Sequence, residues 1–389
     1  MKHISSPRVL LIGLTLLGLP AVATACLWDY DTLKQERARF PSTLEIITGK
    51  FLRHSPEFYQ WRITDRLEKL KADPNNLALH DDLAVAYQKT GQPDKAIEQM
   101  LAKEKIKPGV YETYSNLGTF YILKGEFEKG LPYIDKALAI NPDAHFGREK
   151  YQKWLVEYAM RRKGSSLSFP LQDVWGKEEI PPASGNFRHF LAKKLDVTKD
   201  NEPSLDQLQA AVKGVLGMMR FADHDNPLLL EALGDLLGSD HGYAVNTDAK
   251  RLSARCYLLA SHQMKDDASK DRYRTLAKHI LDMQLIDDTE NQQKSAVIEA
   301  ELQTEVADAN TWYAELKNKE VGWIASGANV ETEFDKLYTK EPTSDLPSSG
   351  SPLSPEQRML IYGPIFVIGS LLSLILIGWG IGRLARFIA

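Results

Sequence analysis

The chain has 389 residues, of which 43% are hydrophobic and 26% are charged, and its formal net charge is −4. This composition fits a globular body with an apolar core, and the mild negative charge argues against nucleic-acid binding, which gathers lysine and arginine on one face. Its two cysteines, Cys26 and Cys256, are too few for a disulfide scaffold or a cysteine-based zinc cluster.

Residues 1–25 have the pattern of a secretory signal peptide. A positively charged start and an apolar run over residues 9–19 precede the small-x-small cleavage site Ala23-Thr24-Ala25. The run is too short to span a bilayer, which takes about 20 apolar residues. We therefore expect cleavage after Ala25 and export of the remaining chain.

Cleavage there would make Cys26 the first residue of the mature chain, and three interpretations remain open. Cys26 is acylated, as in a lipoprotein, although Ala23 stands where a lipobox usually has leucine. Alternatively it forms a disulfide with Cys256, or the two thiols are unrelated, because sequence separation does not fix spatial proximity. Acylation would place Trp28 and Tyr30 near the membrane surface, whereas a disulfide would dock them on the body.

Residues 26–76 are predicted to be an N-terminal helical segment. Its main helix covers residues 56–71, where apolar side chains fall largely on one side. These side chains are Phe58, Trp61, Ile63, Leu67 and Leu70. We expect this helix to pack against the start of the region that follows it.

Residues 77–144 contain two segments that match at a shift of 34 residues, one starting at Leu77 and the other at Tyr111. Small side chains at matched positions let two antiparallel helices approach closely, aromatic side chains fill the space between them, and prolines end each unit. The matched packing residues are Leu83 and Leu117, Ala84 and Gly118, Tyr87 and Tyr121, Ala96 and Gly130, and Pro108 and Pro142. The period and these residues resemble the tetratricopeptide repeat family. The resemblance implies an all-α fold of stacked helical hairpins, which is an α-solenoid.

The resemblance also implies a partner-binding groove along the first helix of each pair. Its candidate contact residues here are Asp81, Val85, Gln88, Lys89, Glu112, Ser115, Asn116 and Thr119. Asn116 matches one position of the carboxylate clamp of chaperone-binding members, but Asp81 and Val85 replace the expected lysine and asparagine. We therefore do not expect capture of a C-terminal carboxylate. The alternative for all these residues is ordinary solvated surface.

Helical and loop-rich regions alternate after the repeats. Residues 145–163 are predicted to be a capping helix, and residues 164–204 a loop-rich linker. Residues 205–340 are predicted to be a second helical region, in which a helix at 205–221 precedes a degenerate repeat-like unit. Further helices are expected at 252–262, 272–283 and 293–320.

Acidic residues and histidines gather around one predicted helix of this second region. Asp223, His224, Asp225 and His241 are candidates to approach one another and bind a divalent metal. Turn chemistry explains them equally well, because Asp225 precedes a natural helix start and His241 lies in a predicted loop. The sequence contains no phosphate-binding glycine loop, nucleophile elbow or H-E-x-x-H motif. We therefore expect no catalytic residues, no cofactor and no enzyme activity.

The C-terminal end of the sequence predicts a membrane anchor. Residues 341–357 are rich in proline and serine, which is typical of a flexible tether. Residues 358–384 contain an uncharged stretch that is long enough to cross a bilayer as one helix. Arginines follow this stretch, so residues 385–389 are expected to be a cytoplasmic tail, with the body on the periplasmic side of the inner membrane.

These features favour an exported, membrane-anchored scaffold or assembly factor of the cell envelope, which binds protein partners and no nucleic acid. The alternative function is a metal-dependent or other enzyme that uses the site around Asp223, His224, Asp225 and His241.

Overall fold

The computed structural model describes residues 27–162, 169–171, 185–197, 202–239, 242, 246, 248–282 and 288–338. Helices are the regular elements of this part of the chain, and no strand occurs in it, as the all-α prediction requires. The signal peptide, Cys26, the tether and the C-terminal span that the sequence predicts lie outside these residues. Within them, no helix combines the length and the apolar character that crossing a membrane requires.

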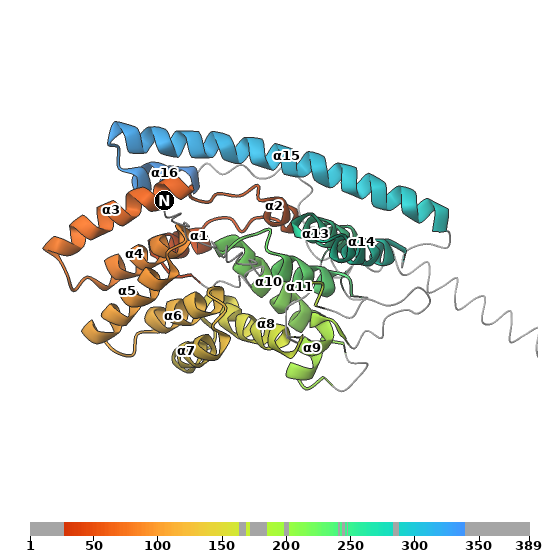
Figure 1. Cartoon of the computed structure of the whole chain (residues 1–389), viewed down its shortest axis with the longest axis horizontal. Coiled ribbons are helices and arrows are strands. Elements are labelled where there is room, and N and C mark those ends of the chain that lie inside the picture. Colours follow the sequence, from red (N-terminus) through yellow and green to blue (C-terminus); the bar gives the residue numbers. More distant parts are fainter. Residues whose placement is uncertain are drawn as a thin grey trace, which may run out of the picture.

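Consecutive antiparallel helices build the repeat lobe (Figure 1). The helices predicted to start at Leu77 and Tyr111 do so, and α3 begins at Pro56 as predicted. The second helices end at Ala72, Ile106 and Ile140, at intervals of 34 residues, so α3 occupies the place of a second helix before the first repeat. The lobe comprises α3 (Pro56–Ala72), α4 (Leu77–Lys89), α5 (Pro93–Ile106), α6 (Tyr111–Leu123), α7 (Phe127–Ile140), the 3-10 turn η1 (Ala144–Gly147) and α8 (Arg148–Arg162).

Glycines set the spacing of the α6–α7 hairpin. A Cβ atom on Gly130 would lie 2.8 Å from the carbonyl oxygen of Gly118, and one on Gly118 would lie 2.5 Å from Cδ1 of Ile134. Neither position has room for a larger side chain without separating the helices, so the small residues of the repeat pattern have the packing role that the sequence predicts for them.

A second lobe follows and shares an apolar core with the end of the first. Helix α10 packs against both α8 and α11, and one cluster of buried side chains runs from Ile46 through the lobe to Leu302. The helix predicted at 205–221 is α10, whereas the one predicted at 272–283 begins earlier, because the side chain of Asp266 accepts a hydrogen bond from the Ser269 amide at 2.8 Å. The lobe comprises α9 (Phe187–Lys194), α10 (Leu205–Phe221), α11 (Pro227–Leu237), α13 (Ala249–Gln263) and α14 (Asp267–Asp282).

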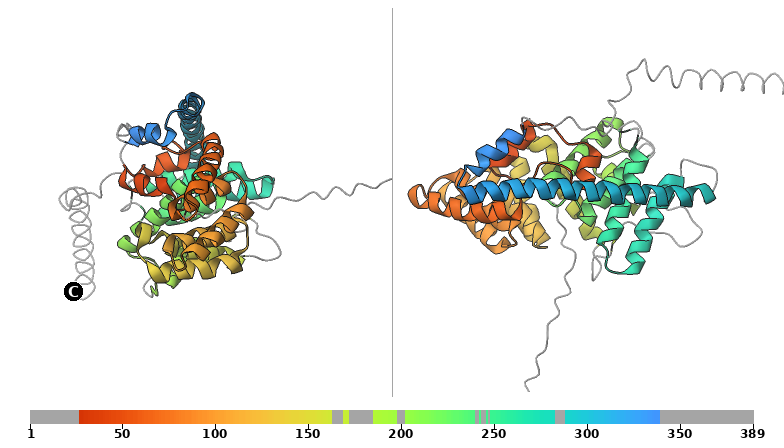
Figure 2. Two further views of the ribbon diagram at one scale, coloured as in Figure 1. Left: turned by 90° about the vertical axis from the view of Figure 1, so that its left-hand side faces the viewer. Right: turned by 90° about the horizontal axis from the view of Figure 1, so that it is seen from above.

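A long helix, α15 (Asp288–Ser326), lies across both lobes, and α16 (Val330–Tyr338) folds back beside it (Figures 1 and 2). The long helix contacts α13 and α14 of the second lobe and α3 of the repeat lobe. Two short helices, α1 (Tyr30–Arg37) and α2 (Thr43–Thr48), complete the described elements. This arrangement brings the beginning and the end of the described chain together over the repeats.

Candidate functional site

The concave side of the repeats is covered in this structure. Asp81, Val85, Ser115, Asn116 and Thr119 are at most 5% exposed, so these five candidate groove residues are not ordinary solvated surface. The other three candidates, on the same first helices, are partly exposed; they are Gln88, Lys89 and Glu112. The prediction of an open groove therefore needs correction, because other parts of the same chain fill it.

The segment Leu27–Thr32 fills the part of the groove between α4 and α6. The side-chain amide of Asn116 donates to the Trp28 carbonyl oxygen at 3.0 Å and accepts from the Trp28 amide at 2.9 Å. The Tyr30 amide donates to Oδ1 of Asp82 at 2.8 Å. These contacts recognise the backbone of the segment and not its side chains.

Apolar contacts fix the same segment. Leu27 is only 3% exposed and joins the core cluster that contains Val85 and Leu117. The Trp28 ring lies edge-on to the Tyr111 ring, with 6.2 Å between their centroids. Trp28 is therefore docked on the repeat body, which is one of the two placements considered for it.

Asp29 turns the segment from an extended chain into helix α1. Its backbone is extended, with φ −148° and ψ −174°, and its side chain accepts hydrogen bonds from the amides of Asp31 and Thr32, both at 3.1 Å. This is an N-cap that satisfies the first free amides of the helix. Because Asp29 lies in the groove, its carboxylate both caps α1 and contacts the guanidinium of Arg62.

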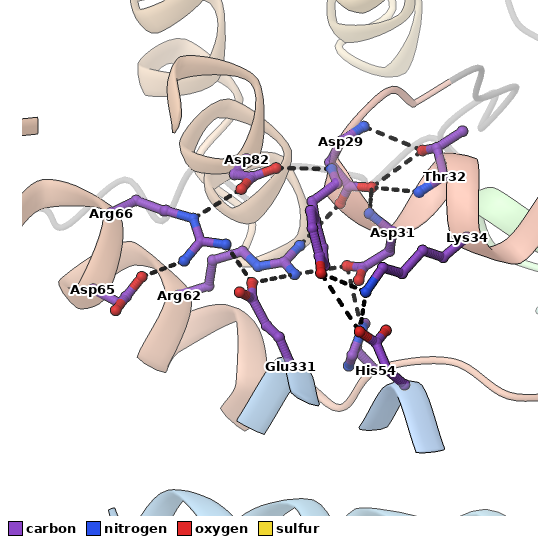
Figure 3. A network of polar contacts seen from close by, with 12 residues as sticks. Asp29, Asp31, Thr32, Lys34, His54, Arg62, Asp65, Arg66, Asp82 and Glu331 are labelled. Atoms are coloured by element: carbon purple, nitrogen blue, oxygen red, sulfur yellow. Dashed lines mark hydrogen bonds and ion pairs between the residues drawn. The ribbon is translucent and has the colours of Figure 1, made fainter. Parts of the chain in front are cut away.

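A buried ionic network lies beneath the segment (Figure 3). The guanidinium of Arg62 contacts Asp29 at 3.1 Å, Asp31 at 2.7 Å and Glu331 of α16 at 2.8 Å, and the Arg62 side chain is fully buried. The neighbouring Arg66 pairs with Asp82 at 2.8 Å and also contacts Glu331. Because buried cations need carboxylate partners, Asp29 and Asp31 hold the segment in the groove by charge.

His54 joins three distant parts of the chain. Its Nδ1 lies 2.5 Å from Oε1 of Glu320 in α15, and its Nε2 lies 3.2 Å from Oδ2 of Asp31. Burial by itself lowers the pKa of His54, but the two carboxylates outweigh burial and raise the pKa to about 9. The imidazole is therefore protonated at neutral pH and links α15 to the N-terminal segment.

The rest of the groove is closed by polar contacts between helices. The hydroxyls of Tyr111 and Ser115 donate to Oε1 of Glu149 in α8, at 2.5 Å and 3.2 Å. Lys103, which occupies a position where a small residue is usual, donates to both carboxylate oxygens of Asp81 at 2.7 Å and 2.6 Å. The unusual lysine and the unusual aspartate are therefore one buried ion pair.

A comparison with protein-family models matches residues 111–144, which contain α6 and α7, to the tetratricopeptide repeat. Residues 111–144 are a tetratricopeptide repeat. No curated protein matches the chain. The preceding hairpin of α4 and α5 begins 34 residues earlier, at the period of the tetratricopeptide repeat.

A cavity of about 230 Å³ adjoins the occupied tetratricopeptide groove. Leu27, Lys89, Arg53 and Tyr313 are among its lining residues. The Lys89 ammonium donates to the Ala222 carbonyl oxygen at 3.0 Å, and the Arg53 guanidinium lies over the Tyr313 ring at 3.7 Å from its centroid. Burial lowers the pKa of both cations.

Asp223, His224 and Asp225 line this cavity, while His241 lies outside the described residues. Burial and the nearby Arg53 lower the pKa of His224 to about 3, so the ring is neutral. A Cβ atom on Gly49 would clash with Nε2 of His224, which shows how tightly this ring is packed. Among the described residues no group of three or more metal-binding side chains is placed to hold an ion.

The remaining candidate residues are the two cysteines and the packing residues of the repeats. Cys256 is a fully buried free thiol in α13, and lipidation of Cys26 concerns a residue outside the described part. Most of the repeat packing residues are buried between helices, Tyr87 and Tyr121 are half-buried, and Pro108 and Pro142 are exposed after α5 and α7.

The sequence did not predict the occupied groove. Trp28 and Asn116 are 88 residues apart, and no local pattern encodes their contact. The one available signal was the mixture of apolar, aromatic and acidic residues from Leu27 to Asp31.

Proposed function

We propose that the protein is an exported scaffold or assembly factor of the cell envelope that binds a protein partner through its repeats. The observation that carries the proposal is a tetratricopeptide repeat whose concave side holds another segment of the chain through its backbone. Repeats of this kind suggest protein–protein interaction. The proposal gives the protein a binding role and no catalytic one.

The proposed location rests on the two ends of the sequence. A signal-peptide pattern covers residues 1–25, and an uncharged apolar stretch lies within residues 358–384. Arginines on the C-terminal side of this stretch favour an inner-membrane protein with a single span, a cytoplasmic C-terminus and a periplasmic body.

The outer helices of the repeats offer accessible positions for finding the partner. Leu101 of α5 is 37% exposed and Ile140 of α7 is 48% exposed, while Val297 of α15 is 54% exposed and distant in sequence from the repeats. A photo-crosslinking residue at Leu101 or Ile140, introduced in intact cells, should capture a discrete protein that the same residue at Val297 does not capture. The same bands from all three positions would contradict a partner on the repeats.

The topology can be tested on the same cells. A cysteine that replaces Ile140 should react with a membrane-impermeant thiol reagent in intact cells, whereas a cysteine added after Ala389 should react only after lysis. The opposite pattern would overturn the proposed orientation.

A further inference from the structure

The contacts of the segment Leu27–Asp31 describe what the tetratricopeptide groove accepts. Asn116 binds the Trp28 amide and carbonyl together, and Asp82 accepts from the Tyr30 amide. Every residue except proline presents the same amide and carbonyl, so these contacts read the backbone before and at the start of α1 and require no particular side chain at those positions. The groove therefore holds a peptide that is extended at Asp29 and begins a helix at Tyr30.

Charge adds a requirement on the side chains of the occupant. Arg62 has three carboxylate partners, and two of them, Asp29 and Asp31, belong to the segment. The third, Glu331, is shared with Arg66. Without the segment, the buried guanidinium would lose two of its three carboxylate contacts and keep the shared Glu331 and the nearby charge of Asp82, so an occupant with negative charge at this point is favoured.

Apolar contacts add a second requirement. Leu27 enters the core between the repeats, and Trp28 lies against Tyr111. Leu27 is also among the residues that line the cavity of about 230 Å³. An occupant with apolar or aromatic residues next to its carboxylates satisfies both requirements.

We propose that the segment Leu27–Asp31 is an exchangeable, built-in occupant, and that the partner inserts into the same groove an acidic-aromatic segment of its own that begins a helix at its first carboxylate, as Asp29 does here. This rests on the proposed partner-binding function and specifies the chemistry of the partner. Because the built-in segment belongs to the same chain and continues directly into α1, it competes with a partner segment at a high effective concentration. A partner segment therefore enters when it binds more tightly or when the built-in segment is loosened.

A peptide with the sequence of residues 27–37, labelled with a fluorophore, is a direct probe of this exchange. Its binding to the full chain, purified in mild detergent, is measured by fluorescence anisotropy. The double variant L27A/W28A loosens the built-in segment and leaves the groove unchanged. We expect the peptide to bind this variant at least tenfold more tightly than it binds the unmodified chain. If the double variant does not unfold cooperatively, the single variant W28A replaces it, because Trp28 is only partly buried.

Two matched controls test the stated chemistry. Adding Asn116→Ala to the loosened variant should weaken peptide binding at least tenfold, because the paired contacts to the backbone are lost. A peptide carrying D29N and D31N should bind the loosened variant at least tenfold more weakly than the acidic peptide. Equal binding of the neutral peptide would overturn the acidic requirement, and indifference to Asn116→Ala would overturn the assigned groove.

The exchange itself is contradicted if the peptide binds the folded, loosened variant no better than the unmodified chain. Dimerisation of the unmodified chain that disappears with Asn116→Ala would assign the groove to a second copy and would also overturn the proposal. These results are separable from the partner-binding function, because capture of a partner from Leu101 or Ile140 does not depend on peptide exchange.

Discussion

The hairpin α6–α7 of the tetratricopeptide repeat and the hairpin α11–α13 of the second lobe each pack a glycine closely against the facing helix. The atoms that this glycine meets differ between the two hairpins. A Cβ on Gly130 would meet the backbone oxygen of Gly118 at 2.8 Å, whereas one on Gly234 would meet the Tyr257 ring at 2.8 Å. The first contact lies within the repeat itself, and the second depends on a ring whose hydroxyl donates to Asp235 at 2.7 Å.

Elsewhere in the second lobe, buried carboxylates accept hydrogen bonds from groups that are distant in sequence. Glu231 accepts from the Leu171 amide at 2.9 Å and from the Tyr273 hydroxyl at 2.8 Å. Asp235 accepts from the Phe187 amide at 2.8 Å. Helix α11 therefore holds segments that are 42 to 60 residues distant in sequence by buried polar contacts, whereas α6 and α7 meet through small and apolar residues of one unit, Gly118 against Ile134 and Gly130 against Ile122. A local, periodic design can be recognised from sequence, and a design based on long-range polar contacts cannot.

The largest difference in lost stability between the two lobes should appear when a buried cation is removed from each. Arg62→Ala leaves the buried carboxylates of Asp29 and Asp31 without the cation that they share, and it should lower the free energy of unfolding by about 3–5 kcal/mol. Arg255→Ala in the second lobe should cost only about 1 kcal/mol, because its partners Glu301 and Glu305 are partly exposed. Denaturant unfolding of both variants measures the difference, and equal losses would contradict it.

Histidines should make the two lobes sensitive to opposite ends of the pH range. The pKa of His54 is raised to about 9, so its stabilising charge is fully present below pH 6.5 and is lost as the pH rises through 9, at a cost of about 3 kcal/mol. The pKa of His189 in the second lobe is lowered to about 4 by burial, so its contribution is lost as the pH falls from 6.5 toward 4.

Hydrogen exchange measured separately for each lobe at pH 5, 7 and 9 checks this pair of effects. The repeat lobe should lose protection at pH 9 and the second lobe at pH 5. The variant His54→Gln should abolish the alkaline loss only; an unchanged alkaline loss in that variant would assign it to another group.

Glycine substitutions sharpen the comparison of the two hairpins. Gly130→Ala should destabilise by about 1–3 kcal/mol, because a backbone oxygen cannot move aside. Gly234→Ala should cost less, because the Tyr257 ring can shift. Gly322→Ala on α15 has open space around it and should be neutral or stabilising by up to about 1 kcal/mol. Thermal unfolding gives the order, and a greater loss at Gly234 than at Gly130 would break the comparison.

The smallest expected effect concerns tyrosine hydroxyls. Tyr273→Phe removes a donor to the buried Glu231 and should cost about 1 kcal/mol. Tyr121→Phe in the repeat should change stability by less than about 0.5 kcal/mol, because this half-buried ring packs in a stack against Tyr133. Chemical unfolding of the two matched variants separates these values, and equal costs would remove the distinction between the lobes.

Most helices could be predicted from the sequence because their signals are local. Helix α10 begins after Ser204, whose capping box with Gln207 is visible in the sequence, and its bounds match the predicted ones. The long helix α15 extends beyond the predicted residues 293–320 at both ends. Helix periodicity there gives little guidance, since apolar residues do not follow one face over its whole length.

The occupied groove could not be predicted, for the opposite reason. Asn116 matches one position of the carboxylate clamp, which predicts a ligand from another chain. Its actual partner is the backbone of Trp28, and backbone groups carry no sequence signature. The role of Arg62 was equally hidden, because its three carboxylates come from the N-terminal segment and from α16 at the other end of the described chain.

Hydrogen exchange of the segment 27–32 tests the central claim, that the chain's own N-terminal segment occupies the tetratricopeptide groove. In the unmodified full chain, the amides of Trp28 and Tyr30 should exchange as slowly as those of α4 and α6, because each donates to a side chain of the groove. Asn116→Ala should accelerate exchange of Trp28 while α6 keeps its protection. Exchange of this segment at the rate of an unfolded chain in the unmodified protein would contradict the account.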